Sequence, residues 1–598
     1  MLMVAGEAVR IANCSGFFGD RPSGAAEMVE GGPIDVLTGD WLAELTMLIL
    51  SRTRAGRSGR GYARTFVTQM EQVMGTCLDR DIKVVSNAGG LDPAGCAEAV
   101  AEVAASLGLS PAIAYVDGDD LMDRVADLSA RGELRPFGPD GTLGDPAALV
   151  TANAYLGCWG IVEALDLGAD IVVTGRVTDA ALTCGPAAWR HRWQRDDFDQ
   201  LAGAVVAGHV IECSAQVTGG NYSFFTEIDG YHEVGGRARF GFPWAEVAAD
   251  GSSVIGKHDG TGGTVSVGTV TSQLLYEIVG PEYLGPDVTA RFDTIEVAEA
   301  GPDRVRISGV RGQAPPATLK VAMNEVGGYR NSFTVALTGL DIEAKAAFAQ
   351  AAFWDANPLG PGDYEALASR VVRTDRPDPA TQEEATATWR LTVKDHDEHK
   401  VGRAFADAVV HTVLAGIPGM YPLSGSPGPA QPFGVYRPAT VPAALVPQQV
   451  HLLGGQTVEV SSVAPTGAAL EIQVAEPLPA PTGSTVDAPI GRVVGTRSGD
   501  KGGDANLGVF ARNDTGWAWL DSTLTVDRLR ELLPETADLA VERHRFSNLR
   551  ALNFVIRCLL EEGVAASTRP DAQAKALGEW LRARVVAVPT KALDPPRR

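Results

Sequence analysis

The stretch Ala-Asp-Ile-Val-Val-Thr-Gly-Arg-Val-Thr-Asp-Ala-Ala-Leu, residues 169–182, decides the fold of this chain. Its β-branched run predicts a strand over 169–174, which leads into the polar loop Gly-Arg-Val-Thr-Asp at 175–179. Strands that alternate with such loops and with helices are typical of a parallel sheet with crossover helices. Ligands bind such sheets at the carboxyl ends of the strands, so we expect chemistry at this loop.

The same unit of strand, polar loop and helix recurs upstream. We predict strands over 9–14, 82–86 and 112–116, and helices over 41–51, 62–78, 94–107 and 152–167. Each of these strands also ends in a loop rich in Gly, Asn and Asp, at 15–22, 87–93 and 117–120. Four polar loops at four strand ends indicate an active or binding site at one edge of the sheet.

The composition changes after residue 215. Gly, Thr and Val become frequent, and alternating runs at 264–270 and 305–310 predict a β-rich or mixed segment, followed by a helix over 340–352. Residues 418–449 are rich in Pro and Gly and look like a long connection, and 477–490 look like a linker. We therefore predict four parts: a strand-loop-helix region (1–215), a β-rich second part of the main domain (216–445), a connecting segment (446–490) and a C-terminal domain (491–598).

The net charge supports the last boundary. Residues 491–598 hold 17 Lys and Arg against 14 Asp and Glu, a net charge of +3, whereas the whole chain carries −23 and residues 1–490 therefore carry −26. The predicted order over 492–583 is strand, strand, helix, strand, strand, helix, which is consistent with a small α+β fold of ferredoxin-like type. The expected fold class is an α/β main domain with a largely parallel sheet and a β-rich middle segment, plus this small domain.

Composition excludes several classes of protein. The acidic chain of 598 residues lacks the positive field that nucleic acids require, and anionic membrane surfaces are disfavoured for the same reason. No apolar run reaches the roughly 18 residues of a membrane helix, and the start of the chain does not resemble a secretion signal. The seven cysteines are scattered without a Cys-x-x-Cys pair, so neither a disulfide framework nor a zinc site is predicted. We expect a cytoplasmic homo-oligomer without nucleic-acid or membrane partners.

Two glycine-rich loops offer anion-binding groups. The loop at 14–24 contains Asp20 and fits neither the phosphate-binding loop nor the dinucleotide fingerprint, so no nucleotide cofactor is predicted and the cofactor stays unknown. The second loop joins Lys257 to a flexible turn that has the parts of a phosphate or carboxylate cradle. The residues of that turn are Gly260, Thr261, Gly262 and Gly263. On spacing alone, a purely structural tight turn explains either loop equally well.

Two further motifs pair a basic or imidazole side chain with a carboxylate. Arg176 and Asp179 follow a predicted strand, where the guanidinium is suited to clamp a planar anion or to form a buried ion pair with the carboxylate. His209 and Glu212 share one face if their segment is helical. They then form either a base–acid pair or a structural hydrogen-bonded pair, and spacing favours the structural pair.

The C-terminal domain opens with a dense polar loop over 497–506. Arg497, Ser498, Asp500 and Lys501 lie in it, and such loops either contact a ligand or pack against another domain. Asn87, in the loop after the strand at 82–86, is a further candidate for substrate binding.

Seven stretches together resemble the acyclic terpene utilisation (AtuA) family. They lie at 15–20, 86–93, 174–182, 208–221, 257–266, 273–278 and 497–512. The resemblance covers about 1–445 and 491–590, and implies the family's main domain followed by its ferredoxin-fold domain, which in this family is fused, as here, or separate. Members are associated with bacterial breakdown of citronellol- and geraniol-type compounds, whose intermediates are acyl-CoA thioesters.

Residues and resemblance together predict an enzyme of lyase or hydratase type that acts on a branched, anionic, acyl-CoA-like small molecule. Asp20, Asp179 and Glu212 are the expected acid and base groups, and Arg176, Asn87, Lys257 and the 260–263 and 497–501 loops are expected to bind the substrate. No metal ligand set is predicted. Two alternatives remain open: a non-catalytic scaffold or thioester-binding protein, and a hydrolase of an ester or amide with a Ser or Cys nucleophile.

Overall fold

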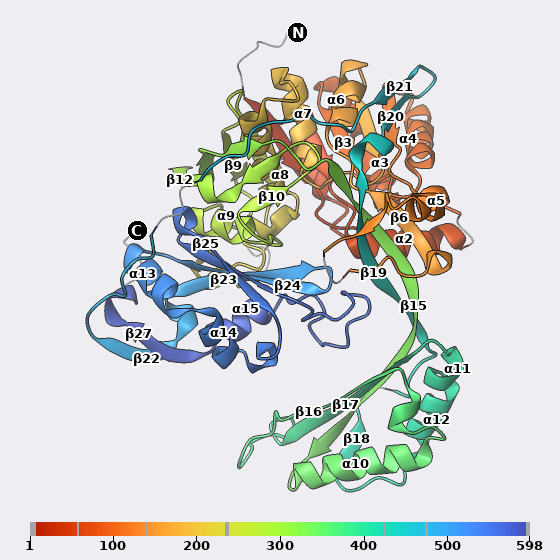
Figure 1. Cartoon of the computed structure of the whole chain (residues 1–598), viewed down its shortest axis with the longest axis vertical. Coiled ribbons are helices and arrows are strands. Elements are labelled where there is room, and N and C mark those ends of the chain that lie inside the picture. The colour runs from red at the N-terminus through yellow and green to blue at the C-terminus, as the bar shows by residue number, and fades with distance from the viewer. Residues whose placement is uncertain are drawn as a thin grey trace. The chain divides into compact units, whose positions relative to one another are not determined.

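An eleven-stranded sheet dominates the computed structural model, which describes residues 8–56, 59–138, 141–233, 239–423, 425–472 and 476–593 (Figure 1). The strand order is β12-β13-β9-β8-β1-β2-β3-β7-β4-β20-β21. The five strands from β1 to β4 in this order are parallel: β1 (Val9–Asn13), β2 (Val36–Gly39), β3 (Lys83–Ser86), β7 (Ile171–Thr174) and β4 (Ile113–Asp117). The flanking strands are antiparallel: β12 (Glu296–Gly301), β13 (Arg304–Ser308), β9 (Ser253–Lys257), β8 (Pro243–Val247), β20 (Gln448–Leu452) and β21 (Thr457–Val460).

The prediction of a largely parallel sheet is therefore wrong for the sheet as a whole, although a mixed α/β fold is confirmed. The parallel strands come from the first 174 residues, where crossover segments join them. The flanking strands come mostly from later residues and include tight antiparallel neighbours such as β8–β9, β12–β13 and β20–β21. Short connections between consecutive strands force antiparallel pairing, because a parallel pair needs a crossover of a dozen or more residues.

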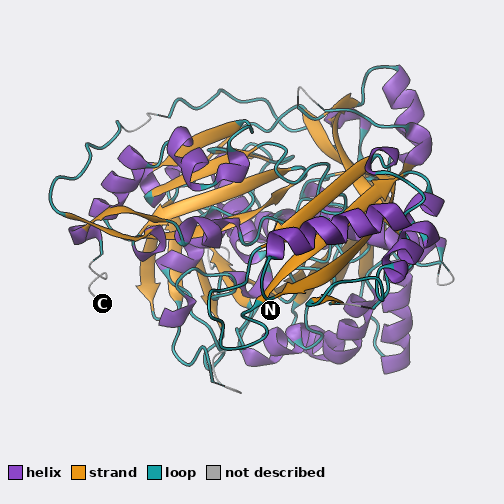
Figure 2. Ribbon diagram, turned by 90° about the horizontal axis from the view of Figure 1, so that it is seen from below, coloured by secondary structure: helices purple, strands orange, loops and turns teal. Residues whose placement is uncertain are grey.

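Helices cover both faces of the parallel strands. Successive side chains along each strand point to opposite faces of the sheet, so both faces present apolar residues on which helices pack. On one face Ala12, Leu37 and Val84 pack with α1 (Gly24–Gly31), α3 (Arg64–Asp79) and α4 (Pro93–Leu107). On the other face Ile11 and Val85 pack with α6 (Trp159–Asp166), α7 (Ala181–His191) and α8 (Phe198–Ile211). Figure 2 shows the strands of the chain in orange and its helices in purple.

Three predicted segments have a different structure. Residues 152–167 begin in the strand β6 (Leu149–Ala154) and only then form α6. Residues 264–270 lead into α9 (Val267–Leu274), because Ser266 caps the helix by accepting a hydrogen bond from the Thr269 N–H. The expected long connection at 418–449 contains β18 (Met420–Pro422), β19 (Gln431–Pro442) and part of β20.

The C-terminal part has the predicted strands and helices. Its sheet runs β23 (Val494–Lys501), β24 (Asp504–Ala511), β26 (Ala551–Ile556) and β25 (Val541–Phe546), all antiparallel. The helices are α13 (Asp514–Thr523), α14 (Val526–Leu532) and α15 (Leu577–Arg582), and β22 (Thr485–Pro489) pairs with β27 (Val585–Pro589). The polar stretch 497–506 is not an open loop but the end of a β-hairpin that turns at Gly502 and Gly503.

This C-terminal sheet packs closely on the segment that follows α9. Asn506 and Asn553 donate side-chain hydrogen bonds to the carbonyl oxygens of Leu275 and Ile278, at 3.1 and 3.0 Å. A β-carbon placed on Gly508 would lie 2.6 Å from the β-carbon of Leu275. The close approach therefore depends on glycine at this position of β24.

We expect Gly508→Ala to lower the free energy of unfolding by about 1–3 kcal/mol, because the added methyl group overpacks this contact. Chemical unfolding of the full chain measures the change. Gly362→Ala is the matched control, since a β-carbon there would meet nothing within 4 Å. Equal stability of the two variants would contradict the close packing.

Contacts divide the chain into two compact units. The first comprises residues 1–324, 436–564 and 571–598, and the second comprises 325–435 and 565–570. The second unit contains α10 (Ile342–Ala356), α11 (Glu398–Val401), α12 (Arg403–His411), β16 (Ala366–Val372) and β17 (Thr386–Asp395), around a core with Phe333, Phe353 and Trp389. The strand β15 (Thr318–Thr338) runs from one unit into the other. The four-part division by composition stays a prediction.

The remaining elements of the first unit are short, apart from α2 (Glu44–Ala55). They are α5 (Val125–Ala130), β5 (Arg135–Pro136), β10 (Glu282–Leu284), β11 (Thr289–Arg291) and β14 (Arg311–Gln313). Across the described residues, every helix is too short or too polar to cross a lipid bilayer.

Candidate functional site

Three loops meet at the carboxyl ends of the parallel strands. Arg176, just after β7, donates a hydrogen bond to the carbonyl of Leu42 at 2.9 Å and lies 3.0 Å from the Asp179 carboxylate. Its guanidinium also stacks over the ring of Tyr155, 4.1 Å from the ring centroid. The Arg176 side chain is only 3% exposed, whereas that of Asp179 is 30% exposed. Burial beside carboxylates therefore leaves Arg176 as a fixed cation at the edge of the sheet.

Asp40, just after β2, was not anticipated from the sequence. Asn87 donates its amide hydrogen to this carboxyl and accepts a hydrogen bond from the Trp41 N–H at 2.8 Å. Burial, and then the nearby Asp179 charge, raise the pKa of Asp40 well above its ordinary value. Both ends of Asn87 are thus used inside the protein, which makes it a positioning residue for Asp40.

Asp119, after β4, is a second buried carboxyl at this edge. One of its oxygens accepts hydrogen bonds from the backbone N–H of Arg176, at 2.9 Å, and from Asn153, at 2.8 Å. Burial raises its pKa from 3.8 to about 7 despite these bonds. The group therefore gains or loses its proton close to neutral pH.

This raised pKa predicts a pH dependence of stability. Between about pH 4 and pH 7 the folded protein keeps the Asp119 proton that the unfolded chain has lost, so stability falls as pH rises through this window. In the wild type this group makes the free energy of unfolding fall by about 1.4 kcal/mol per pH unit in this window, and we expect Asp119→Asn to remove that contribution. Chemical unfolding of both proteins at several pH values between 4 and 8 measures it, and parallel curves would contradict the assignment.

His209 and Glu212 lie at the C-terminal end of α8, so the helical arrangement that would place them on one face is present. His209 Nδ1 is 3.5 Å from Glu212 Oε1, and Nε2 lies 3.1 Å from the carbonyl of Gln273. A carbonyl can only accept, so Nε2 carries the proton and Nδ1 presents its lone pair to Glu212. Asn13 holds the carbonyls of Ile211 and Glu212, at 2.6 and 2.8 Å. The last residue of β1 thereby fixes the position of the pair.

The pKa values of both groups are shifted toward the uncharged form. Burial, and then the charge of Lys501, lower the pKa of His209 to about 4. Burial, and then the charges of Asp179 and Glu277, raise the pKa of Glu212 well above its ordinary value. These shifts favour the neutral imidazole of His209 and the carboxylic acid form of Glu212. Within the described ranges, His209 Nδ1 and Glu212 Oε2 are buried without a hydrogen-bond partner.

The C-terminal domain supplies cations to the same cluster. Arg497 lies over the ring of Tyr276, 3.9 Å from its centroid, and contacts Gln216. Lys575 contacts the hydroxyl of Tyr276, and its Nζ lies 3.5 Å from Glu277. Lys501 is a charged neighbour of both His209 and Glu212. The predicted residues Arg176, Asp179, Glu212 and Lys501 are therefore brought into one electrostatic cluster.

Glu277, Tyr276 and Lys575 are members of this cluster that sequence reasoning missed. Glu277 adopts a left-handed backbone with φ of 55°, which is rare for a residue with a side chain. Its N–H donates to Asn506 at 2.8 Å, so the C-terminal domain helps to hold this conformation. The only signal in the sequence was that residues 273–278 lie among the stretches that resemble the family.

Lys257 and the turn after it have structural partners instead. Lys257 Nζ lies 2.9 Å from the Asp303 carboxylate and donates to the Thr261 carbonyl, also at 2.9 Å. Thr261 donates to the His258 carbonyl, and Gly260 and Gly263 have left-handed φ angles of 75° and 79°. Gly262 accepts a hydrogen bond from the Gly241 N–H. These bonds support the tight-turn interpretation of this loop.

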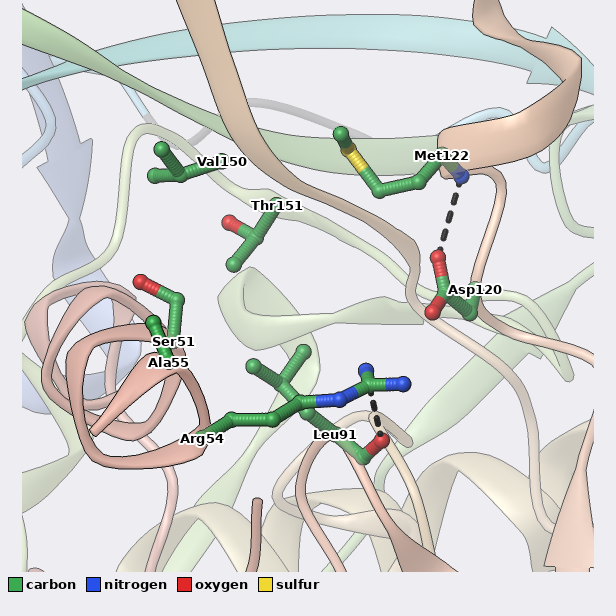
Figure 3. A pocket seen from close by; sticks show the side chains of 8 residues that line it. All are labelled: Ser51, Arg54, Ala55, Leu91, Asp120, Met122, Val150 and Thr151. Atoms are coloured by element: carbon green, nitrogen blue, oxygen red, sulfur yellow. Dashed lines mark hydrogen bonds between the residues drawn. The ribbon is translucent and has the colours of Figure 1, made fainter. Parts of the chain in front are cut away.

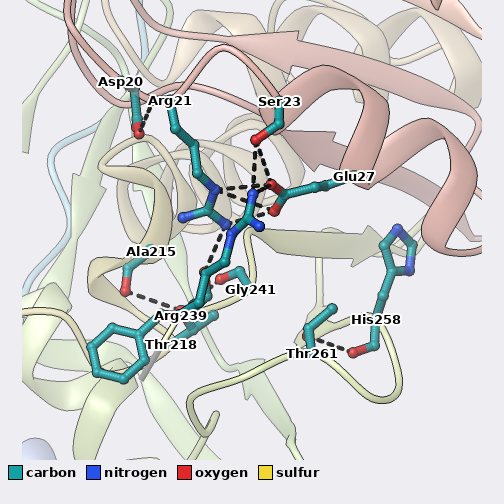
Figure 4. Close-up of polar contacts among 11 residues, drawn as sticks. Asp20, Arg21, Ser23, Glu27, Ala215, Thr218, Arg239, Gly241, His258 and Thr261 are labelled. Carbon is teal, nitrogen blue, oxygen red and sulfur yellow. Dashed lines mark hydrogen bonds and ion pairs between the residues drawn. The ribbon is translucent and has the colours of Figure 1, made fainter. Parts of the chain in front are cut away.

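Asp20 likewise serves its own loop. Its carboxylate accepts hydrogen bonds from the N–H groups of Gly16 and Arg21, at 3.0 and 2.8 Å. Figure 4 shows the network beside Asp20 in which Arg21 and Arg239 bind Glu27. Ser498 accepts from the Gly578 N–H at 3.0 Å and so anchors α15. Asp500 lies 3.6 Å from Lys575.

The chain shows no assembled metal centre in its described ranges, since no three His, Cys, Asp or Glu side chains are grouped as ligands of one ion. The arrangement instead offers proton transfer. Glu212, whose acid form is favoured by burial, and the partly exposed Asp179 belong to one cluster, with cations from two parts of the chain beside them. Paired carboxyls whose surroundings separate their pKa values are a recurring device of acid–base enzymes.

Comparison with known proteins identifies two family matches in chain order. Residues 9–452 match the model for the acyclic terpene utilisation family protein AtuA, and residues 488–587 match the AtuA ferredoxin-like domain. The second match confirms the predicted ferredoxin-like fold of the C-terminal part. No curated protein and no solved structure matches the chain.

Proposed function

The chain belongs to the acyclic terpene utilisation (AtuA) family, and from this membership we propose that it is an enzyme that adds water to, or removes it from, an acyl-CoA-like intermediate. The family gives the metabolic context, the use of acyclic terpenes. The reaction is inferred from the cluster around Glu212. The single observation that carries it is the buried Glu212, whose acid form is favoured by burial and by the charge of the partly exposed Asp179.

Hydration of a double bond conjugated to a thioester needs two proton transfers. Asp179 would take a proton from water as the water oxygen bonds to the β-carbon. Glu212 would then give its proton to the α-carbon as the enolate collapses back to the thioester carbonyl. In the reverse direction Glu212 would take the α-proton, and Asp179 would protonate the leaving hydroxyl, which departs as water.

The cations of the cluster suit the charge that develops during this step. Electron density moves onto the thioester oxygen in the enolate, and fixed positive groups lower the energy of that state. Lys501 is the candidate, since its charge acts on His209 and Glu212. Arg176 would hold Asp179 in place, and His209 would accept a hydrogen bond from the acid form of Glu212.

A hydrolase with a cysteine nucleophile is less well supported. Cys213 adjoins Glu212, but burial raises the pKa of its thiol well above the ordinary value. Such a thiol stays protonated, and the thiolate is the reactive form. The scaffold alternative predicts binding without turnover, which the experiment below separates from catalysis.

Turnover of a panel of branched 2-enoyl-CoA and 3-hydroxyacyl-CoA thioesters, followed by mass spectrometry, tests the proposal. We expect interconversion of one such pair by the purified full chain. Binding of the thioesters without conversion would overturn the proposal and favour a thioester-binding protein.

Light scattering of the same sample tests the proposed homo-oligomer, and cell fractionation tests the proposed cytoplasmic location.

A further inference from the structure

A cavity of about 280 Å³ lies beside the candidate site, between α2 and the strand β6. Figure 3 shows Arg54 on α2, Leu91 in the loop after β3, Asp120 and Met122 after β4, and Val150 on β6 around it. At about 30 Å³ for each water-sized group, the cavity holds about nine of them. That is the volume of a small organic molecule rather than of one ion.

The walls of this cavity combine an apolar surface with one guanidinium. Leu91, Met122 and Val150 supply aliphatic and thioether surface. Arg54 reaches toward the cavity, and among the described residues its guanidinium has a hydrogen bond only to the Leu91 carbonyl, at 3.3 Å (Figure 3). A guanidinium has five N–H donors, so most remain available to a ligand.

Asp120 adds a carboxylate to the lining of the cavity. One of its oxygens accepts a hydrogen bond from the Met122 N–H at 3.0 Å, which fixes the carboxylate at the wall of the cavity (Figure 3). A ligand carboxylate would be repelled by Asp120 and attracted by Arg54. Like-charge contacts of this kind select the orientation of a ligand as well as its class.

The cavity is built from the same segments as the candidate site. The helix α2 begins two residues after Leu42, whose carbonyl accepts from Arg176. Leu91 lies in the loop of Asn87, and Asp120 follows Asp119, which accepts from the Arg176 N–H. A ligand in the cavity would therefore touch segments that also hold the acid–base cluster.

We propose that this cavity binds a short branched aliphatic carboxylate, with the carboxylate on Arg54 and the chain against Leu91, Met122 and Val150. The ligand is either the carboxylate-bearing tail of the thioester substrate or a free acid that binds on its own. This inference goes beyond the proposed reaction. Binding of a carboxylate in the cavity can be measured whether or not the protein converts a thioester.

Isothermal titration calorimetry of the full chain with 4-methylpentanoate tests the proposal, since this probe has about eight non-hydrogen atoms and fills the volume. We expect binding that weakens about tenfold in Arg54→Gln, which corresponds to the loss of one charge-assisted hydrogen bond, about 1.4 kcal/mol. Asp120→Asn should tighten it. The matched control is Arg131→Gln, whose side chain is 48% exposed and pairs with Asp127.

Three results would overturn the proposal: no binding of the probe, equal affinity of the wild type and Arg54→Gln, or equal affinity for the uncharged 4-methylpentanamide. Where a thioester substrate is turned over, competitive inhibition by the probe identifies the substrate tail as the ligand, and non-competitive inhibition identifies a free acid. Where no thioester is turned over, calorimetry alone shows whether the cavity binds the carboxylate. A failure of the proposed reaction is therefore distinguishable from a failure of binding in the cavity.

Discussion

Glu212→Gln is expected to lower kcat by about 10²–10⁴-fold, the usual contribution of a positioned general acid or base. The amide keeps the shape of the carboxylic acid and can still donate a hydrogen bond toward His209 Nδ1, so the fold should persist. It cannot release a proton to the α-carbon. The loss should therefore appear in kcat and leave substrate binding nearly unchanged.

Steady-state kinetics with the thioester found in the panel measures this loss. Glu343→Gln is the matched control, because the Glu343 side chain is 75% exposed and pairs with Arg373 in the second unit. The wild type should also lose activity as pH rises through the raised pKa of Glu212, since the acid form is the active one. Full turnover by Glu212→Gln would show that another group supplies the proton.

Arg176→Met is expected to cost about 3 kcal/mol of folding free energy as well as activity. Methionine removes the hydrogen bond to Leu42, the stacking on Tyr155 and the partner of Asp179. Removing one member of a buried ion pair is costly, because the other charge loses its partner. Asp179 would then be less firmly placed as the base, so kcat should fall with the stability.

Chemical unfolding and kinetics on the same variant separate the two effects. Arg176→Lys keeps the charge without the planar guanidinium, so it should recover part of the stability but less of the activity. Arg131→Gln is again the control for loss of an exposed arginine. A fully stable and active Arg176→Met would contradict the role of this side chain in both fold and site.

The parallel part of the fold could be predicted because local sequence determines it. Strands and helices over residues 9–116 and 169–174 follow from runs of β-branched residues and from helical spacing, and the polar loops mark the strand ends. The strand β2 was missed, and Asp40 with it, since the strand is only four residues long. The antiparallel flanks depend on pairing between distant segments, which no local pattern specifies.

Only part of the candidate site could be predicted, because local sequence does not specify which distant segments come together. Arg176, Asp179, His209 and Glu212 are close in sequence to strand and helix ends, where polar residues stand out. Glu277 and Lys575 come together only because the ferredoxin-like domain packs on the segment after α9. Conversely, no local pattern indicates that Lys257 pairs with Asp303, which lies 46 positions away.

Hydration of the branched 2-enoyl-CoA thioester in D₂O tests the central claim most directly, because it reports the proton transfer itself. Mass spectrometry should show a 3-hydroxyacyl product with deuterium at the α-carbon, formed by the wild type and by Glu343→Gln but not by Asp179→Asn or Glu212→Gln. Equal deuterium incorporation by all four proteins would contradict an acid–base site built on Asp179 and Glu212.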